Sequence, residues 1–171
     1  MYKRQYLERD LADLARLSDL SPFRKFQKLA ALRSAKLLNY SELARDAGVS
    51  VDTAKRYLEY LRISYQTVLL QPYHKNITSS VVKTPKVFWA DIGLLRHLTG
   101  FRGELTGEIY ETMVVGEIYK WVKTSQKDTE LSFYRSRSGL EIDILMETET
   151  GIIGMETVSY THLTLPTKRI V

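Results

Sequence analysis

Hydrophobic residues recur at helical spacing through the first sixty residues of the chain and alternate at strand spacing near its end. Periods of three to four residues predict amphipathic helices, whereas a period of two predicts half-buried strands. Ser21 and Pro22 predict the cap and the first position of a helix over 21–38, which follows an earlier helical stretch. The apolar positions on which these two helices depend are Leu11, Leu14, Leu17, Leu20, Phe23, Phe26, Leu29, Ala30 and Leu32.

Two shorter helices follow, and a glycine separates them. Ser41 is the expected cap of a helix over 42–46, and Gly48 is the expected left-handed residue that ends it. Ser50 is the expected cap of a second helix over about 51–61. A short helix, a glycine turn and a second helix are typical of a helix-turn-helix, in which the second helix enters the major groove of DNA.

The exposed face of that second helix is the candidate DNA-binding surface. Lys55 and Arg56 form its basic pair and are expected to contact phosphates, which position a protein without reading sequence. Two alternatives stay open, because such helices also serve as plain packing hairpins or as docking modules for protein partners. The face comprises Asp52 and the four predicted contacts to double-stranded DNA, which are Ser50, Thr53, Lys55 and Arg56.

Two strand-like segments after these helices predict the wing of a winged helix. Residues 63–76 and 81–91 are rich in β-branched and aromatic residues and flank a polar loop. Asp91 then opens a short helix, which a linker punctuated by glycines follows. The basic residues expected to decorate the polar loop are Lys75, Lys83 and Lys86.

The last third of the chain predicts a helix followed by three strands, which is the beginning of an α/β sheet. Residues 107–123 have an amphipathic helical pattern, and strands are expected over 131–136 and within 139–157, where apolar and acidic residues alternate. The residues expected on the inner side of the helix are Ile109, Met113, Val114, Ile118 and Trp121.

Three acidic residues of this last part are candidate metal ligands. Glu111 lies on the expected helix, Asp143 in the middle of a strand and Glu156 on the next strand. Mg²⁺ and Mn²⁺ prefer carboxylate oxygens that converge from adjacent elements, and metal-dependent phosphodiester hydrolysis needs such a cluster to activate water. The alternative is that these acids are solvated residues beside strands, as most surface acids are.

Both ends of the chain resemble translated sequencing adapter. Val158–Thr167 is similar to a translation of the adapter, and Met1–Gln5 is similar to its reverse complement with GTG as start codon; a natural tail of unusual composition is the alternative. We therefore exclude 1–5 and 158–171 from the fold. These ends carry four of the 25 basic residues and no acid, so the net charge of +5 falls to +1 without them. The overall charge then predicts no nucleic-acid partner, and any DNA contact has to come from local clusters.

Cysteine usage and hydropathy narrow the location of the protein. The chain has no cysteine, which suits a reducing cytoplasm. No apolar run reaches the length of a membrane span, so we expect no membrane partner and a cytoplasmic location.

Six motifs follow one another along 6–157, which they span almost completely. They are "YLERDL", "LNYSELARDAGVSVDTAKRYLEYL", "LLQPYHKN", "KTPKVFWADIGLL", "GEIYETMVVGEI" and "FYRSRSGLEIDILME". In this order they resemble the C-terminal region of a family of bacterial and archaeal AAA-like P-loop ATPases, a region known as a domain of unknown function (DUF forty-one forty-three).

The resemblance implies an ATPase domain upstream of this region. This chain has no phosphate-binding loop, so ATP would bind in that upstream domain. It also implies an α+β fold, with a winged helix-turn-helix over 6–100 and a truncated restriction-endonuclease-like α/β domain over 101–157. In that fold an acid on a helix, an aspartate on a strand and a Glu-x-Lys motif form the catalytic metal site. Glu111, Asp143 and Glu156 match the acids, but Val158 stands at the lysine position.

The sequence therefore predicts the effector part of an ATP-dependent, DNA-associated protein that is itself catalytically incomplete. The alternative is a non-enzymatic interaction or regulatory module of the same ATPase. A third possibility is that the winged helix binds protein partners while the ATPase remodels them.

Overall fold

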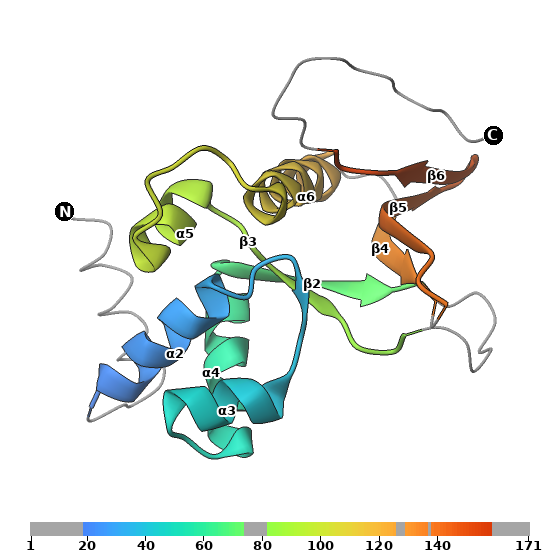
Figure 1. Ribbon diagram of the computed structural model, residues 1–171. Coiled ribbons are helices and arrows are strands. Elements are labelled where there is room, and N and C mark those ends of the chain that lie inside the picture. The colour runs from blue at the N-terminus through green and yellow to red at the C-terminus, as the bar shows by residue number, and fades with distance from the viewer. Residues whose placement is uncertain (1–18, 74–81, 126–128, 137, 159–171) are drawn as a thin grey trace.

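The structure is a computed structural model that describes residues 19–73, 82–125, 129–136 and 138–158 (Figure 1). Within these ranges the fold is α+β, as predicted, with five helices and one mixed six-stranded sheet. The helices are α2 (Ser21–Ala31), α3 (Tyr40–Ala47), α4 (Val51–Ile63), α5 (Ile92–Thr99) and α6 (Gly107–Thr124). The strands are β1 (Lys36–Leu37), β2 (Thr67–Pro72), β3 (Lys86–Trp89), β4 (Glu130–Arg135), β5 (Glu141–Thr148) and β6 (Gly151–Met155).

One sheet runs through both parts of the chain that the sequence treats as separate modules. Its strand order is β1-β3-β2-β4-β5-β6. All neighbouring strands are antiparallel except β2 and β4, which pair in parallel where Gln71 and Pro72 lie opposite Ser132 and Phe133. The chain returns from β3 to β4 through α5 and α6, since parallel strands need a long crossover. The β2–β4 pairing therefore joins the first part of the described chain, which contains α2 to α5 and is called the helical part below, to the C-terminal strands β4, β5 and β6.

The helix predicted over 21–38 is shorter than expected. Pro22 does lie in the first turn, but α2 ends at Ala31, and Leu20 rather than Ser21 occupies the N-cap position without a side-chain hydrogen bond. The chain then reverses through Ala35, whose φ is 66°, and the Ala35 N–H donates to the Val87 carbonyl at 2.8 Å. Pairing of β1 with β3 thus replaces the last turns of the predicted helix, because tertiary hydrogen bonds override helix propensity.

The helix–glycine–helix segment forms as predicted, apart from its first cap. Gly48 ends α3 in the left-handed conformation with φ of 75°, and the Ser50 side chain accepts a hydrogen bond from the Thr53 N–H at the start of α4. The cap of α3 is Asn39, whose side chain accepts from the Glu42 N–H. Ser41 lies inside the helix instead, so its predicted role as cap is wrong.

The central strand β3 is buried on both faces and divides the core in two. Val87 and Trp89 pack with the helices α2 to α5, whereas Phe88 packs with α6 and the strands β2, β4 and β5. Figure 1 shows the same division, with α6 above the sheet and α2, α3 and α4 below it. Because side chains alternate along a strand, Lys86 lies on the same face as Phe88.

The predicted inner face of α6 is confirmed in part, because Ile109 is buried and Val114 and Ile118 pack, partly buried, against the core. Trp121, expected inside, is 49% exposed. Apolar residues occur on more than one side of this helix, so the sequence alone did not select the face that meets β3. The buried positions are Ile109, Thr112, Val115, Gly116 and Val122.

The C-terminal strands form as expected, but β6 ends before two of the residues assigned to it. Glu156 follows β6 rather than lying within it, and Val158 is 49% exposed. The segments 1–5 and 159–171 lie outside the described residues. No helix in the described part of the chain is long and apolar enough to cross a membrane.

Candidate functional site

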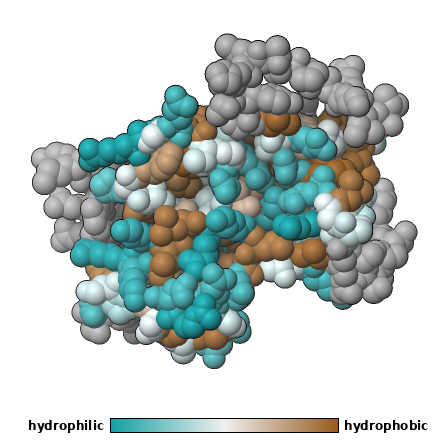
Figure 2. Space-filling view, viewed as in Figure 1, coloured by the Kyte–Doolittle hydropathy of each residue, from teal (hydrophilic) through white to brown (hydrophobic). Residues whose placement is uncertain are grey.

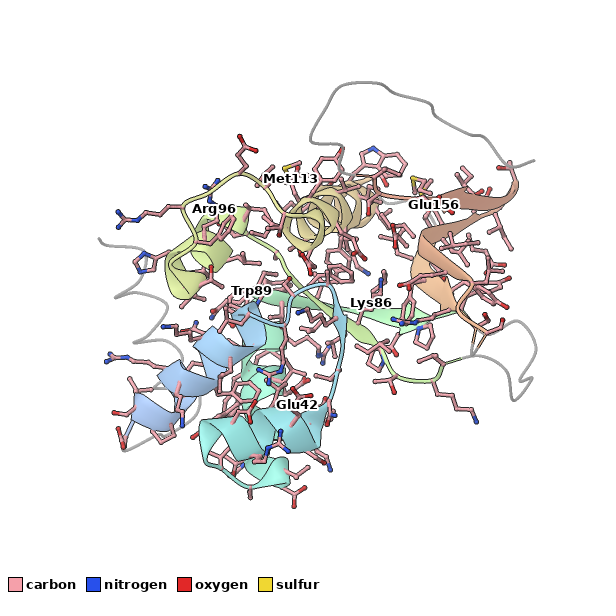
Figure 3. All side chains as sticks on the ribbon, viewed as in Figure 1. Glu42, Lys86, Trp89, Arg96, Met113 and Glu156 are labelled. Carbon is pink, nitrogen blue, oxygen red and sulfur yellow. The ribbon has the colours of Figure 1, made fainter. Side chains whose placement is uncertain are left out.

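Lys86 is a buried lysine on which three carboxylates converge. Its side chain is only 2% exposed, and its Nζ lies 2.9 Å from Glu111 Oε1 and 2.7 Å from Glu141 Oε1. Asp143 Oδ1 lies slightly further away, at 3.9 Å from the same nitrogen. Figure 3 labels Lys86 near the middle of the molecule. This group, Lys86 with Glu111, Glu141 and Asp143, is called the Lys86 cluster below.

Three secondary-structure elements bring the cluster together. Lys86 opens β3, opposite Leu70 of β2, and points to the α6 side of the sheet. Glu111 lies in the second turn of α6, and Glu141 and Asp143 share one face of β5 because they are two residues apart. The Phe133 ring of β4 completes the surroundings, with its centroid 5.5 Å from Lys86 Nζ.

Burial and the excess of acids set the charges of the cluster. Burial lowers the pKa of the Lys86 ammonium, but the hydrogen bonds and charges of Glu141 and Glu111 outweigh it, so its pKa lies above the ordinary value. Burial raises the pKa of Glu111; the ion pair with Lys86 opposes this, and repulsion from Asp143 and Glu141 adds to it. Three acids compete for one ammonium, so the cluster carries excess negative charge even though every acid faces a cation.

Outer partners hold the two β5 acids in place. Asp143 Oδ2 accepts from both the Thr157 N–H and the Thr157 hydroxyl, each at 2.8 Å. Glu141 Oε2 lies 3.6 Å from Arg135 Nη1. Both acids are therefore fixed on the side that faces away from Lys86.

The structure brings two of the three predicted metal ligands together. Glu111 and Asp143 meet at Lys86, but Glu156 is exposed and makes no ion pair or hydrogen bond with a described residue of the cluster. Thr157, its neighbour, takes the contact to Asp143 instead. Over the described ranges, no three acidic or histidine side chains are arranged to hold a metal ion. Binding of Mg²⁺ or Mn²⁺ stays a prediction.

The residue that sequence reasoning missed is Lys86. It was expected on an exposed loop with Lys83, which is exposed, and Lys75, which lies outside the described residues. The expectation for Lys86 is wrong because the residue belongs to the strand rather than to the loop before it. The signal was present in "KVFW", where Lys86 has the same strand parity as the apolar Phe88.

The two basic residues of the predicted DNA-binding face of α4 are exposed, and each contacts a residue of its own helix. Lys55 Nζ lies 3.3 Å from Asp52 Oδ1, and the Arg56 guanidinium donates to the Thr53 hydroxyl at 3.3 Å. Figure 2 shows hydrophilic residues gathered over α3 at the bottom of the view. The ionic residues of α3 and α4 balance, with acids Glu42, Asp46, Asp52 and Glu59 against bases Arg45, Lys55, Arg56 and Arg62.

The outer face of α2 is basic and has no acid beside it on the helix. Lys25 and Lys28 are exposed and make no ion pair with any residue that the structure describes, and Lys28 lies between Arg24 and Lys25 on the same arc of the helix. The opposite face of α2 reaches α4, because the Phe23 and Phe26 rings pack edge-on against Tyr57 at 5.2 and 5.6 Å. Among the described residues, α2 thus presents two exposed lysines, Lys25 and Lys28, that have no ion pair with another described residue.

A separate hollow of about 410 Å³ is lined by residues of β2, β4 and the C-terminal half of α6. Its floor includes Val68, Leu70 and Val122. None of the predicted site residues lines it.

Two family models match the chain and meet between residues 105 and 106. Residues 1–105 match the family described as Domain of unknown function (DUF8612), and residues 106–164 match the family described as Domain of unknown function (DUF4143). The predicted resemblance to the second family is thus confirmed for the C-terminal part only, since the first 105 residues match a different family.

Two mycobacterial proteins are similar to the chain over most of its length. The Uncharacterized protein Rv2008c of Mycobacterium tuberculosis and the Uncharacterized protein Mb2031c of Mycobacterium bovis are each 30% identical over 154 residues. The match covers 81% of this chain but 34% of each relative, so the chain spans about a third of the length of the curated relatives it matches. No solved structure matches the chain. The chain therefore belongs to the family described as Domain of unknown function (DUF8612), followed by a region that matches Domain of unknown function (DUF4143).

Proposed function

We propose that this chain is the effector region of a longer ATP-driven protein and that its helical part contacts duplex DNA. The resemblance to the C-terminal region of AAA-like ATPases supports the first statement, as does the small share of the relatives' length that the chain spans. ATP would bind in a domain outside this sequence. The order α2-β1-α3-α4-β2-β3, with β3 between β1 and β2 in the sheet, supports a winged helix.

The observation that carries the DNA proposal is the exposed N-terminal half of α4. Ser50 caps this helix, and Ser50, Lys55 and Arg56 are all exposed beside the tight turn at Gly48. A helix end of this kind fits the major groove, where the cap and the first turns reach the bases and phosphates. Lys55 and Arg56 bond only within their own helix, so phosphates can replace these weak, exposed contacts.

The basic face of α2 adds the charge that α4 lacks. Affinity for duplex DNA depends on the number of phosphates that lysine and arginine neutralise, and the α3–α4 pair alone is neutral. Lys25 and Lys28 are free of ion pairs with described residues, and α2 packs directly on α4. We therefore expect a phosphate-contacting surface that includes both helices.

The test is binding of fluorescent duplexes of two unrelated sequences at several salt concentrations. Lys55→Ala with Arg56→Ala should weaken binding to both sequences and reduce the slope of log K against log salt by about 1–2, because each phosphate contact contributes about 0.9. Lys25→Ala with Lys28→Ala should give a similar loss. The matched control is Lys36→Ala with Lys120→Ala, which removes two exposed lysines elsewhere and should change neither affinity nor slope.

A protein-docking role is the second candidate, and the charge balance of α3 and α4 favours it. α4 also exposes Val51 (38%) and Ile63 (44%), which are apolar contacts of the kind protein interfaces use. If the Lys55/Arg56 variant binds DNA with unchanged affinity and slope, the contact to DNA through α4 is excluded, and docking of a protein partner becomes the better account.

A further inference from the structure

The Lys86 cluster contains two of the three predicted ligands of a divalent cation, Glu111 and Asp143. The geometry of the cluster does not fit such a cation. The distances of 2.7 and 2.9 Å from Lys86 Nζ to Glu141 and Glu111 are those of charge-assisted hydrogen bonds. Oxygen ligands of Mg²⁺ would lie at about 2.0–2.1 Å around a centre of their own. Here the ammonium group itself occupies the point on which the carboxylates converge.

The second oxygen of Asp143 is also engaged. Thr157 donates two hydrogen bonds to Asp143 Oδ2, while Asp143 Oδ1 faces Lys86. Glu156, the third predicted ligand, does not reach the cluster in the described structure, and Val158 offers neither charge nor a hydrogen-bonding group. A cation would therefore have to displace Lys86 before it could bind two of the predicted ligands.

We propose that the Lys86 ammonium is the resident cation of this acid cluster. The cluster serves as a polar clamp between β3 and the α6–β5 part of the chain, and it is not a catalytic metal site. A buried ammonium is stable only where carboxylates pair with it, and buried carboxylates likewise need a cation. Lys86 on one side of the junction and Glu111, Glu141 and Asp143 on the other satisfy both requirements at once.

A second polar contact, next along α6, supports the clamp. Thr112 follows Glu111, and its hydroxyl donates to the Glu108 carbonyl at 2.7 Å. A hydroxyl has one hydrogen, so in the 2.9 Å contact between Thr112 Oγ1 and Ser34 Oγ the Ser34 hydroxyl is the donor. Ser34 Oγ in turn accepts a hydrogen bond from the backbone N–H of Trp89 at 3.1 Å. Two successive residues of α6 are thus tied to the helical part through buried polar groups.

The experiment compares Mn²⁺ binding to the wild type, to Lys86→Met and to Lys86→Met with Asp143→Asn. Free Mn²⁺ is followed by its electron paramagnetic resonance signal, and the urea midpoint of each protein is measured with and without Mn²⁺. The wild type should neither reduce the Mn²⁺ signal nor gain stability. Without metal, Lys86→Met should have a lower urea midpoint than the wild type. In Mn²⁺ it should regain part of the lost midpoint, because the cation takes the position that the Lys86 ammonium group occupied. The double variant should lose this recovery.

Two results would overturn the proposal. The first is Mn²⁺ binding by the wild type that Asp143→Asn abolishes, since the acids would then hold a metal in spite of Lys86. The second is a folded Lys86→Met protein that does not respond to Mn²⁺, since the ammonium would then not stand in a cation's place. The wild-type measurement decides the first point even if Lys86→Met does not fold. Neither result depends on whether α4 contacts DNA.

Discussion

Lys86 and Glu111 form a buried ion pair, 2.9 Å between Nζ and Oε1, that crosses the boundary between the two families matched by this chain. Lys86 lies in the segment that matches the first family, and Glu111 in the segment that matches the second. The same boundary is crossed by the parallel pairing of β2 with β4. The two segments are therefore joined by backbone hydrogen bonds and by buried charge, and we expect them to fold as one unit.

Lys86→Met should destabilise the protein by about 3–5 kcal/mol, the usual cost of removing one partner of a buried ion pair. The substitution leaves Glu111, Glu141 and Asp143 without the cation that they share. Urea denaturation at neutral pH measures the free energy of unfolding. Lys36→Met, on the exposed side of β1, is the control and should change stability by less than about 0.5 kcal/mol. Equal small effects of both substitutions would show that the cluster contributes nothing to stability.

Glu111→Gln should make stability less dependent on pH. Burial raises the pKa of Glu111 in the folded protein above its ordinary value of 4.5, so the folded state favours the protonated form. The stability that this group contributes is present below its unfolded pKa and is lost as pH rises through the folded value. Glutamine mimics the protonated form, and the fall in stability above about pH 4.5 should therefore be smaller in the variant.

Urea titrations of both proteins between about pH 4 and pH 7 test this expectation. At neutral pH the variant should be at least as stable as the wild type, because the amide oxygen can still accept a hydrogen bond from Lys86 and the cost of ionising a buried carboxyl group is removed. A variant whose stability falls with rising pH as steeply as that of the wild type would contradict the assignment of this titration to Glu111.

Asn39→Ala should cost about 1 kcal/mol, because the Asn39 side chain caps α3 by accepting from the Glu42 N–H. Ser41→Ala should change stability by less than about 0.5 kcal/mol, since Ser41 lies exposed inside the helix. Thermal or urea unfolding of the two variants compares them directly. The reverse order of effects would restore Ser41 as the cap.

Ser34→Ala should cost about 1–3 kcal/mol, the range expected when a buried polar partner is removed. The substitution leaves the backbone N–H of Trp89 without its acceptor and the Thr112 hydroxyl oxygen without its donor. Ser41→Ala is the matched control, since it removes the same hydroxyl from an exposed position. A loss equal to that of the control would mean that the Ser34 hydroxyl does not stabilise the junction.

Local signals in the sequence predicted most of the elements, because their causes lie within a few residues. Gly48 and Ser50 marked the helix–glycine–helix segment. Asp91 marked the start of α5, where its side chain accepts a hydrogen bond from the Leu94 N–H. The errors occurred where distant segments decide the outcome. α2 stops at Ala31 because the chain that follows it pairs with β3, fifty residues away, through contacts such as Ala35 with Val87.

The candidate site was predicted only in part for the same reason. Glu111 and Asp143 were expected to converge, and both lie near Lys86 Nζ, because α6 covers the face of the sheet to which the Asp143 side chain of β5 points. Lys86 could not be placed with them from spacing alone, since β3 belongs to the part of the chain assigned to the wing. Glu156 was expected on a strand, but β6 ends one residue earlier, and no local pattern distinguishes Met155 from Glu156 as its last residue.

The most direct test of the clamp is whether the two family segments unfold together. The chain has two tryptophans, Trp89 in the first segment and Trp121 in the second, so Trp121→Phe and Trp89→Phe each leave one fluorescent reporter. In urea, the fluorescence midpoint of each variant should coincide with its own circular dichroism midpoint, as a single cooperative transition requires. Adding Lys86→Met to each variant should lower the midpoints and separate the two reporters. Separate midpoints already in the presence of Lys86, or coincident ones after its removal, would contradict the role given to this lysine.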